Sequence, residues 1–226
     1  MVYENIRKGT FLRRPNRFVA DVNIDGENVV CHVKNTGRCK ELLLPGAKVY
    51  LSESPNPVRK TKYDLVAVWK KKILVNMDSQ APNRAFHEFL ARGGLKTGIT
   101  LIKPEVKYEG SRFDFYIEFG GGKGFIEVKG VTLEENGAAM FPDAPTERGI
   151  KHLNELAKCV SQGFEAYVIF IVQMKGPAYF TPNYKTHPEF GMALRSAMEA
   201  GVKALAFDCN VAAEKMEIDQ CIPIRL

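Results

Sequence analysis

Long apolar stretches are missing from this chain, and cysteine is scarce. No segment is long and uncharged enough to cross a bilayer, and residues 1–7 lack the apolar run of a secretory signal. The five cysteines are scattered and form neither a Cys-x-x-Cys pattern nor a Cys-His cluster. These absences argue against a disulfide framework and against the common zinc sites. We therefore expect a cytoplasmic protein with reduced thiols and no membrane partner.

Acidic residues are also sparse, but only in the N-terminal part. Residues 1–80 hold 15 lysines and arginines against 8 aspartates and glutamates, whereas residues 81–226 hold 17 against 18. A basic segment attracts polyanions because binding releases condensed counterions. Nucleic acid, either DNA or RNA, is thus the first partner to consider, with Arg38 and Lys40 as candidate contacts. Ordinary solubilising charge would explain the same count.

The first 80 residues follow a pattern of short strands separated by turns. Alternating and β-branched residues predict strands at 17–24, 28–33, 46–51, 63–69 and 72–76. Asp25 and Gly26 mark a tight turn between the first two strands. Five strands in this length suit a small barrel, and an OB-type barrel fits a basic module best. Tyr63 and Trp69 could stack on bases there, although such aromatics are more often part of a core.

The pattern changes near residue 81, where we expect a second domain, residues 81–226, to begin. Pro82 and Gly93 frame a helix, after which strands and helices alternate. We predict strands at 105–108, 112–119, 124–131, 166–172 and 203–208, and helices at 146–161 and 190–200. The predicted fold class is therefore α/β (α+β): a five-stranded OB-like barrel followed by a mixed sheet flanked by helices.

Two of these strands carry the residues most suited to chemistry. Along 112–119, Phe113 and Phe115 are expected on one face and Asp114 on the other; along 124–131, Glu127 and Lys129 share a face. A turn centred between the second and third residues of Gly120-Gly121-Gly122-Lys123 sets Asp114 opposite Lys129 and diagonal to Glu127. The two carboxylates and the ammonium should then converge on one patch.

Such a patch suits phosphodiester hydrolysis. Asp114 and Glu127 could bind Mg²⁺ or Mn²⁺ through oxygen, and the cation would polarise a phosphoryl oxygen and activate water. Lys129 could orient that water or offset charge in the transition state. The alternative is the solvated face of a strand, with Asp114 and Lys129 forming a surface salt bridge. Cover by helices on both sides of the strand favours the site.

Further candidates lie on the predicted helices and strands nearby. Glu88 could approach as an additional metal ligand, although a solvated helix face explains it as well, and Glu105 is similar. Arg148 and Lys151, at the start of the helix at 146–161, could receive a phosphate, and helix capping or surface charge would account for the same residues. His152 is expected to support the site or lie on the surface rather than bind metal directly.

Six segments carry a family resemblance, and the last two together are highly specific: Asn35-Thr36-Gly37-Arg38, Glu41-Leu42-Leu43, Glu105-Val106-Lys107-Tyr108, Arg112-Phe113-Asp114-Phe115, Ile126-Glu127-Val128-Lys129 and Phe141-Pro142-Asp143-Ala144-x-Thr146-Glu147-Arg148-Gly149. Over nearly its whole length the chain resembles the sugar fermentation stimulation protein family, SfsA. The resemblance implies an N-terminal OB-fold, a C-terminal domain similar to PD-(D/E)xK nucleases, DNA binding without marked sequence preference, and a link to maltose metabolism.

By the same resemblance, Asp114, Glu127 and Lys129 would be the nuclease-like triad, with Phe113 standing where the signature has proline. Our leading hypothesis is a DNA-binding protein that is also a Mg²⁺-dependent phosphodiesterase. The alternatives are a non-catalytic DNA-binding regulator on the same scaffold and a phosphodiesterase of small molecules or nucleotides. No helix-turn-helix spacing is present to predict base reading, and the sequence predicts no oligomeric state.

Overall fold

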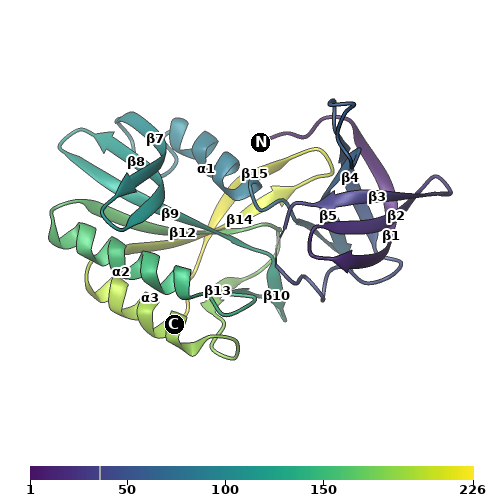
Figure 1. The fold of residues 1–226 in the computed structure, drawn as a ribbon. Coiled ribbons are helices and arrows are strands. Elements are labelled where there is room, and N and C mark those ends of the chain that lie inside the picture. The colour runs from purple at the N-terminus through teal and green to yellow at the C-terminus, as the bar shows by residue number, and fades with distance from the viewer. Residues whose placement is uncertain (36) are drawn as a thin grey trace.

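A computed structural model describes residues 1–35 and 37–226. Thr36, part of the segment 35–38 that carries the family resemblance, lies outside the described residues. A barrel built from the N-terminal strands lies at one end of the molecule, and a larger sheet with three helices forms the other (Figure 1). Among the described residues, the structure has no helix of the length and apolarity needed to span a bilayer.

The N-terminal strands close into the predicted five-stranded barrel. Its members are β1 (Ile6–Asn16), β2 (Val19–Ile24), β3 (Glu27–Val33), β4 (Lys48–Glu53) and β5 (Tyr63–Lys70). β1 pairs with β2 and β4, and the parallel pairing of β3 with β5 closes the ring in the order β1-β2-β3-β5-β4. Val22, Leu51 and Leu65 are fully buried inside it. Positive φ at Asp25 and Gly26 matches the tight turn expected between β2 and β3.

One barrel strand differs from the prediction. β1 was not expected, and the predicted strand at 72–76 is β6 (Ile73–Asn76), which extends the sheet beyond β5 without closing the ring. β1 escapes a search for alternation because Phe11 is its one buried residue, while basic side chains fill much of the rest. Gly9 is needed within it, since a Cβ there would lie 2.6 Å from Val22. The strand that completes the barrel, β1, therefore has a mostly polar sequence.

A mixed sheet organises the C-terminal part, as predicted, and it has six strands, because β15 was not expected. Its order is β15-β14-β12-β9-β8-β7, with β12 parallel to both β9 and β14. The strands are β7 (Ile99–Tyr108), β8 (Ser111–Phe119), β9 (Gly122–Val131), β12 (Glu165–Val172), β14 (Lys203–Val211) and β15 (Met216–Ile222). A small sheet of β10 (Leu133–Glu135), β11 (Ala138–Phe141) and β13 (Tyr179–Pro182) follows the end of β9.

Helices cover both faces of the large sheet (Figure 1). α1 (Ala81–Ala91) buries Phe86 and Leu90 in one apolar cluster with Phe115. α2 (Glu147–Ser161) and α3 (Pro188–Glu199) lie on the other face, where Leu153 and Leu194 join a cluster that is continuous with the barrel core. β9 is therefore covered on both sides, and Glu127, in its middle, faces α2 rather than bulk solvent.

A buried polar joint connects the barrel to α1. Asp78 is fully buried, and its carboxylate accepts hydrogen bonds from Lys34 at 3.2 Å and from Arg84 at 2.7 Å. Gln173, at the end of β12, donates to the backbone oxygens of Asn76 and Asp78 at 3.1 Å. Because buried polar groups are held by such directional bonds, the joint fixes how the barrel meets the sheet.

Candidate functional site

Asp114 lies where β8 separates from β9. Ladder pairing between these strands runs from Phe119 and Gly122 to Phe115 and Ile126 and then stops. Beyond that point the Asp114 carboxylate takes the place of a strand partner. Its Oδ2 accepts the backbone N–H of Val128 at 2.7 Å, and its Oδ1 accepts the Nδ2 of Asn83, in the first turn of α1, at 2.7 Å. Two elements therefore fix the orientation of this carboxylate.

The predicted register of this hairpin is wrong by two residues. The turn consists of Gly120 and Gly121, so Asp114 lies level with Glu127 rather than opposite Lys129. Gly121 has a φ of +87°, which allows the shorter loop. Since side chains alternate with a period of two, a shift of two residues leaves Glu127 and Lys129 on the predicted face of β9.

The predicted common face of Phe113 and Phe115 is also wrong. Phe115 belongs to the cluster under α1, whereas Phe113 packs against Phe125, at 5.1 Å between ring centroids, in the cluster under α2. The strand changes face at Asp114, where its pairing with β9 has ended. Local alternation cannot anticipate this change, because it depends on where the neighbouring strand diverges.

Glu127 is the most tightly held residue of the site. Only 4% of it is exposed, and its Oε1 accepts a hydrogen bond from Lys129 at 2.6 Å and contacts His152 Nδ1. Its Oε2 is buried and has no hydrogen-bond partner among the described residues. An orphaned carboxylate oxygen carries a large desolvation penalty unless something binds it.

The pKa values of Asp114 and Glu127 are shifted in opposite directions. Burial, and then the charge of Glu127, raise the pKa of Asp114 above its ordinary value. Burial alone would raise the pKa of Glu127 as well, but the hydrogen bond from His152 and the charge of Lys129 hold that pKa below its ordinary value. Opposite shifts on neighbouring carboxylates are typical of functional sites.

His152 supports Glu127 from α2. The helix is capped by Thr146, whose hydroxyl accepts the backbone N–H of Gly149 at 3.0 Å, and His152 lies in its second turn with 4% exposure. Arg148 Nε lies 3.4 Å from His152 Nε2. Because a guanidinium can only donate, Nε2 accepts and Nδ1 carries the proton that faces Glu127. His152 thus acts through Glu127, one of the two roles expected for it.

Other sequence candidates lie outside this cluster. Glu88 accepts from the amine of Met1 at 2.8 Å, and its position in α1 is five residues beyond Asn83, on a different side of the helix. Glu105 is exposed on β7 beside Arg112, at 3.8 Å. Within residues 1–35 and 37–226, no group of three or more His, Cys, Asp or Glu side chains is arranged to hold a metal ion. The structure does not bring Glu88 to Asp114 and Glu127.

The basic candidates divide between two places. Arg148 stays beside the site through His152, whereas Lys151 donates to the backbone oxygen of Gly110 at 2.7 Å. Arg38 and Lys40 are exposed and line a hollow of about 470 Å³ at the edge of the barrel. The lining residues are Arg14, Asn16, Arg17, Gly37, Arg38, Lys40, Leu43 and Ala144. We call this the arginine hollow.

Arg14 shapes the loop that carries Arg38. Its guanidinium donates four hydrogen bonds of 2.7–2.9 Å to the backbone oxygens of Arg17, Asn35, Gly37 and Arg38. A second hollow of about 350 Å³ shares Gly37 and Ala144 with the arginine hollow and includes Gly130, the residue after Lys129. The basic loop therefore borders a path that leads toward the end of β9.

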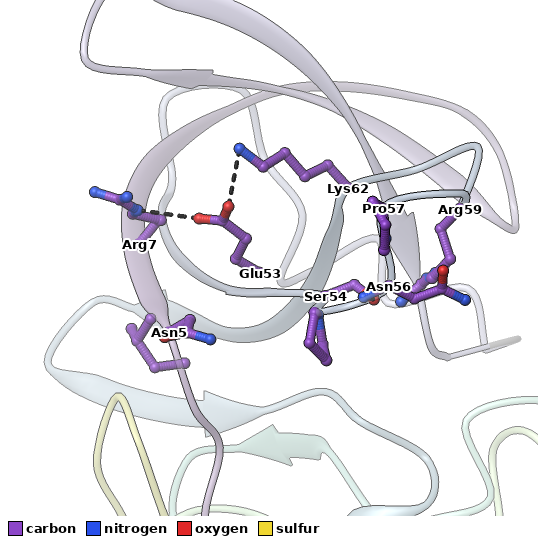
Figure 2. Close-up of a pocket in the computed structure, with 10 residues that line it drawn as sticks. Asn5, Arg7, Glu53, Ser54, Asn56, Pro57, Arg59 and Lys62 are labelled. Atoms are coloured by element: carbon purple, nitrogen blue, oxygen red, sulfur yellow. Dashed lines mark hydrogen bonds and ion pairs between the residues drawn. The ribbon is translucent and has the colours of Figure 1, made fainter.

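A further hollow of about 750 Å³ lies at the loop between β4 and β5 (Figure 2). Its charges are neutralised internally. Glu53 pairs with Lys62 at 2.8 Å and with Arg7 at 3.5 Å, and Arg59 pairs with Asp64 at 2.7 Å. Cations that already have carboxylate partners attract a polyanion weakly, so this hollow is a poor candidate for binding one.

Comparison with known proteins places the chain in a family. The family model described as "SfsA N-terminal OB domain" matches residues 12–77, and the one described as "Sugar fermentation stimulation protein RE domain" matches residues 80–215. The chain belongs to the SfsA family. Two SfsA relatives, each named "Sugar fermentation stimulation protein homolog", support the assignment over the full length. Those of Ruminiclostridium cellulolyticum and Desulfitobacterium hafniense Y51 are 55% and 57% identical over 226 residues, covering 100% of this chain and 100% and 99% of theirs.

A solved structure shares the whole fold. SfsA of Pyrococcus furiosus, in complex with Ca²⁺, is 30% identical, with a TM-score of 0.91 over 100% of this chain and 98% of that chain. The arrangement of barrel, mixed sheet and helices is therefore that of the family.

Proposed function

We propose that this SfsA-family protein binds DNA without marked sequence preference and hydrolyses phosphodiester bonds with Mg²⁺ or Mn²⁺. In this proposal residues 1–80 hold the nucleic acid, and residues 81–226 form a nuclease-like domain of the PD-(D/E)xK type. The observation that carries the proposal is the pair of carboxylates of partly buried Asp114 and buried Glu127, whose pKa values are shifted in opposite directions, with Glu127 Oε2 lacking a partner among the described residues.

The donor set fits a hard divalent cation. Asp114 and Glu127 supply carboxylate oxygens: each oxygen of Asp114 accepts one hydrogen bond and keeps a second lone pair, and Glu127 Oε2 has no partner among the described residues. When bound there, Mg²⁺ would relieve the repulsion between the carboxylates, polarise a phosphoryl oxygen and lower the pKa of a water. The family relative solved in complex with Ca²⁺, another cation that prefers oxygen ligands, supports a divalent site.

The remaining residues have positioning and electrostatic roles in this proposal. Asn83 and the Val128 N–H orient Asp114, and His152 orients Glu127. Lys129, whose side chain is 13% exposed, holds an ammonium beside Glu127. In a partly water-excluded site, that charge stabilises the negative charge that grows on a phosphate in the transition state.

A second candidate function is a DNA-binding regulator of sugar metabolism that does not cleave. One observation favours it: Lys129 already pairs with Glu127 at 2.6 Å, and both oxygens of Asp114 already accept hydrogen bonds. A site whose charges largely satisfy one another can persist as a structural element. The relatives' shared name refers to sugar fermentation, which suits this alternative.

Cleavage assays distinguish the two functions. Single-stranded, duplex and branched DNA are incubated with the wild type in Mg²⁺ and in Mn²⁺, beside Lys129→Met, which keeps the aliphatic stem. We expect metal-dependent cleavage that falls at least about 100-fold in Lys129→Met, the scale of losing one transition-state charge partner. Glu105→Gln, an exposed acid on β7, is the control and should cleave like the wild type. Binding without cleavage would leave the regulator as the better account, and cleavage that does not depend on Lys129 would contradict the role given to this residue.

A further inference from the structure

The outer wall of the barrel carries a second basic hollow, of about 1030 Å³, which we call the lysine hollow. It shares no lining residue with the arginine hollow. The residues that line it are Lys8, Gly9, Thr10, Asn23, Asp25, Gly26, Gly46, Ala47, Lys48, Val49, Tyr50, Trp69, Lys71 and Lys72. They come from β1, the end of β2, β4, the end of β5 and the turns beside these strands.

Strand register shows why these side chains point outward. Lys8 pairs with Tyr50 and Thr10 with Lys48 across β1 and β4, so each pair lies on one face. The residues between them, Val49 and Leu51, are buried in the barrel core. Alternation therefore sends the lysines and the tyrosine to the outer face.

The lysine hollow differs from the hollow in Figure 2 because, among the described residues, its lysine side chains are not neutralised by carboxylate partners. In the part of the chain that the structure describes, none of Lys8, Lys48, Lys71 and Lys72 forms a salt bridge. Asp25 is the one acidic residue that lines the hollow. An excess of unpaired ammonium groups in a concave surface favours a polyanion, because binding releases counterions.

Two aromatic rings lie among these lysines. Tyr50 and Trp69 are both partly exposed, and both line the hollow. A duplex shields the faces of its bases by stacking, whereas a single strand can place its bases on aromatic rings. Rings next to unpaired lysines therefore offer contacts for both the bases and the phosphates of an unpaired strand.

We propose that the lysine hollow binds single-stranded nucleic acid, with a base stacked on Trp69 and phosphates held by Lys8, Lys48 and the lysines of the β5–β6 turn. The inference rests on the nucleic-acid affinity of the proposed function but not on hydrolysis. The inference names unpaired strands as the substrate class. It also places a nucleic-acid-binding site on the outer wall of the barrel, separate from the arginine hollow.

Trp69 reports directly on this contact, because it is the single tryptophan of the chain. Its fluorescence is followed while the wild type is titrated with a 12-nucleotide oligothymidine, its RNA counterpart, an abasic 12-mer and a 12-base-pair duplex. We expect quenching by the oligothymidine and the RNA, and binding of the abasic strand and of the duplex at least about fivefold weaker. Equal affinity and equal quenching for the abasic strand or the duplex would overturn the proposal.

Variants separate stacking from charge, with a labelled oligothymidine and anisotropy as the readout. Trp69→Leu should weaken binding at least about fivefold, while Trp69→Phe, which keeps a ring, should recover most of it. The double variant Lys8→Gln, Lys48→Gln should lower the slope of log K against log salt by about 1.4 units, at about 0.7 per phosphate contact. The control pair Arg7→Gln, Lys62→Gln removes the same charge at the hollow in Figure 2, where both side chains pair with Glu53, and should change the slope little.

The outcomes also separate this inference from the proposed function. Thermal unfolding first confirms that each variant is folded. If the wild type binds no nucleic acid at all, the proposed function fails together with this inference. If it binds, but Trp69→Leu and the Lys8, Lys48 pair behave like the control pair, the lysine hollow is not the grip and only this inference is lost.

Discussion

Asp114 shows at the scale of one residue how a site can conflict with stability. Its carboxylate stands in for a strand partner, accepting from Val128 and Asn83, yet burial and the nearby charge of Glu127 raise its pKa. A raised carboxyl pKa means that the ionised form is less favourable in the folded state than in the unfolded chain. Ionised Asp114 therefore lowers the free energy of unfolding near neutral pH. Such a loss of stability is compatible with the metal-binding role proposed for this residue.

Replacing Asp114 by Asn should stabilise the metal-free protein. The amide has the same shape as the carboxylate, and its oxygen can still accept the hydrogen bond from the Val128 N–H. Its NH₂ group can donate to Asn83 if the Asn83 side-chain amide rotates by 180°, and the unfavourable negative charge is removed. We expect Tm to rise by about 2–4 °C, which corresponds to about 1 kcal/mol for a protein of this size. Under the proposed metal binding, Mn²⁺ should raise the Tm of the wild type, and Asp114→Asn should lose that increase.

Glu88→Gln serves as the control for that measurement. Glu88 pairs with the Met1 amine rather than with the site, so its Mn²⁺-induced increase in Tm should equal that of the wild type. A variant Asp114→Asn that is less stable than the wild type without metal, or that still responds to Mn²⁺, would contradict this account of the residue.

At the scale of elements, Glu165 ties together the beginnings of strands in the large sheet. Its carboxylate accepts from Lys96 at 2.6 Å, after α1, and from Lys203 at 3.0 Å, at the start of β14. Burial opposes ionisation, but the bonds from Lys96, Tyr167 and Lys203 outweigh it and lower the pKa of Glu165 to about 2. One carboxylate therefore links the starts of the parallel strands β12 and β14.

The pH dependence of this contact has a definite sign. A depressed carboxyl pKa gives stability that is complete above the unfolded value near 4.5 and is lost as the pH falls toward 2. Glu165→Gln should thus be less stable than the wild type at pH 7, by about 1 kcal/mol for a partly exposed network. Urea unfolding at pH 7, 4 and 3 should show the difference shrinking as the pH falls. A difference that stays constant would assign the loss to packing.

The elements that could be predicted are those whose pattern is local. Alternation and turn residues were enough for β2 to β5, for the hairpin at Asp25 and for the helices, because each depends on neighbours in sequence. β1 could not be found this way, since its closure of the barrel leaves just Phe11 buried. The register of β8 and β9 depends on which glycines form the turn, and the prediction was wrong by two residues. Because side chains alternate with a period of two, this error left Glu127 and Lys129 on the predicted face.

The part of the candidate site that was missed is long-range. Asn83 contacts Asp114 across 31 residues and carries no local signal, because an Asn early in a helix is common. His152 could be expected to support the site, but its partner Glu127, 25 residues away, could not be read from local sequence. Glu88 attracted attention for its charge, yet the side of α1 that faces Asp114 is set by the packing of Phe86 and Leu90.

At the scale of the whole molecule, basic charge and candidate chemistry are separated. The excess of Lys and Arg lies in residues 1–80, and two hollows on the barrel display part of it. The carboxylates of the site lie between the large sheet and its helices. A long anionic partner could touch both regions at once, and the barrel should then set affinity while the sheet sets chemistry.

Salt dependence tests this division of labour. Removing two charges from the arginine hollow with Arg38→Gln and Lys40→Gln should reduce the slope of log K against log salt on duplex DNA by about 1.5–2 units. Lys103→Gln with Lys107→Gln removes the same charge from exposed positions on β7, the edge strand farthest along the sheet, and should leave the slope nearly unchanged. Equal effects of the two pairs would mean that net charge alone governs binding.

The buried joint at Asp78 fixes the distance between the basic hollows of the barrel and the carboxylates of the candidate site. Lys34 and Arg84 converge on that carboxylate from the barrel and from α1, and Gln173 ties the same segment to β12. Such a joint fixes the distance between the barrel wall and Asp114. Under the proposed function, a strand held at the barrel wall would therefore reach Asp114 after a number of nucleotides that the protein sets. Under the proposed activity, fragment ends would recur at one constant offset from the nucleotide that is held.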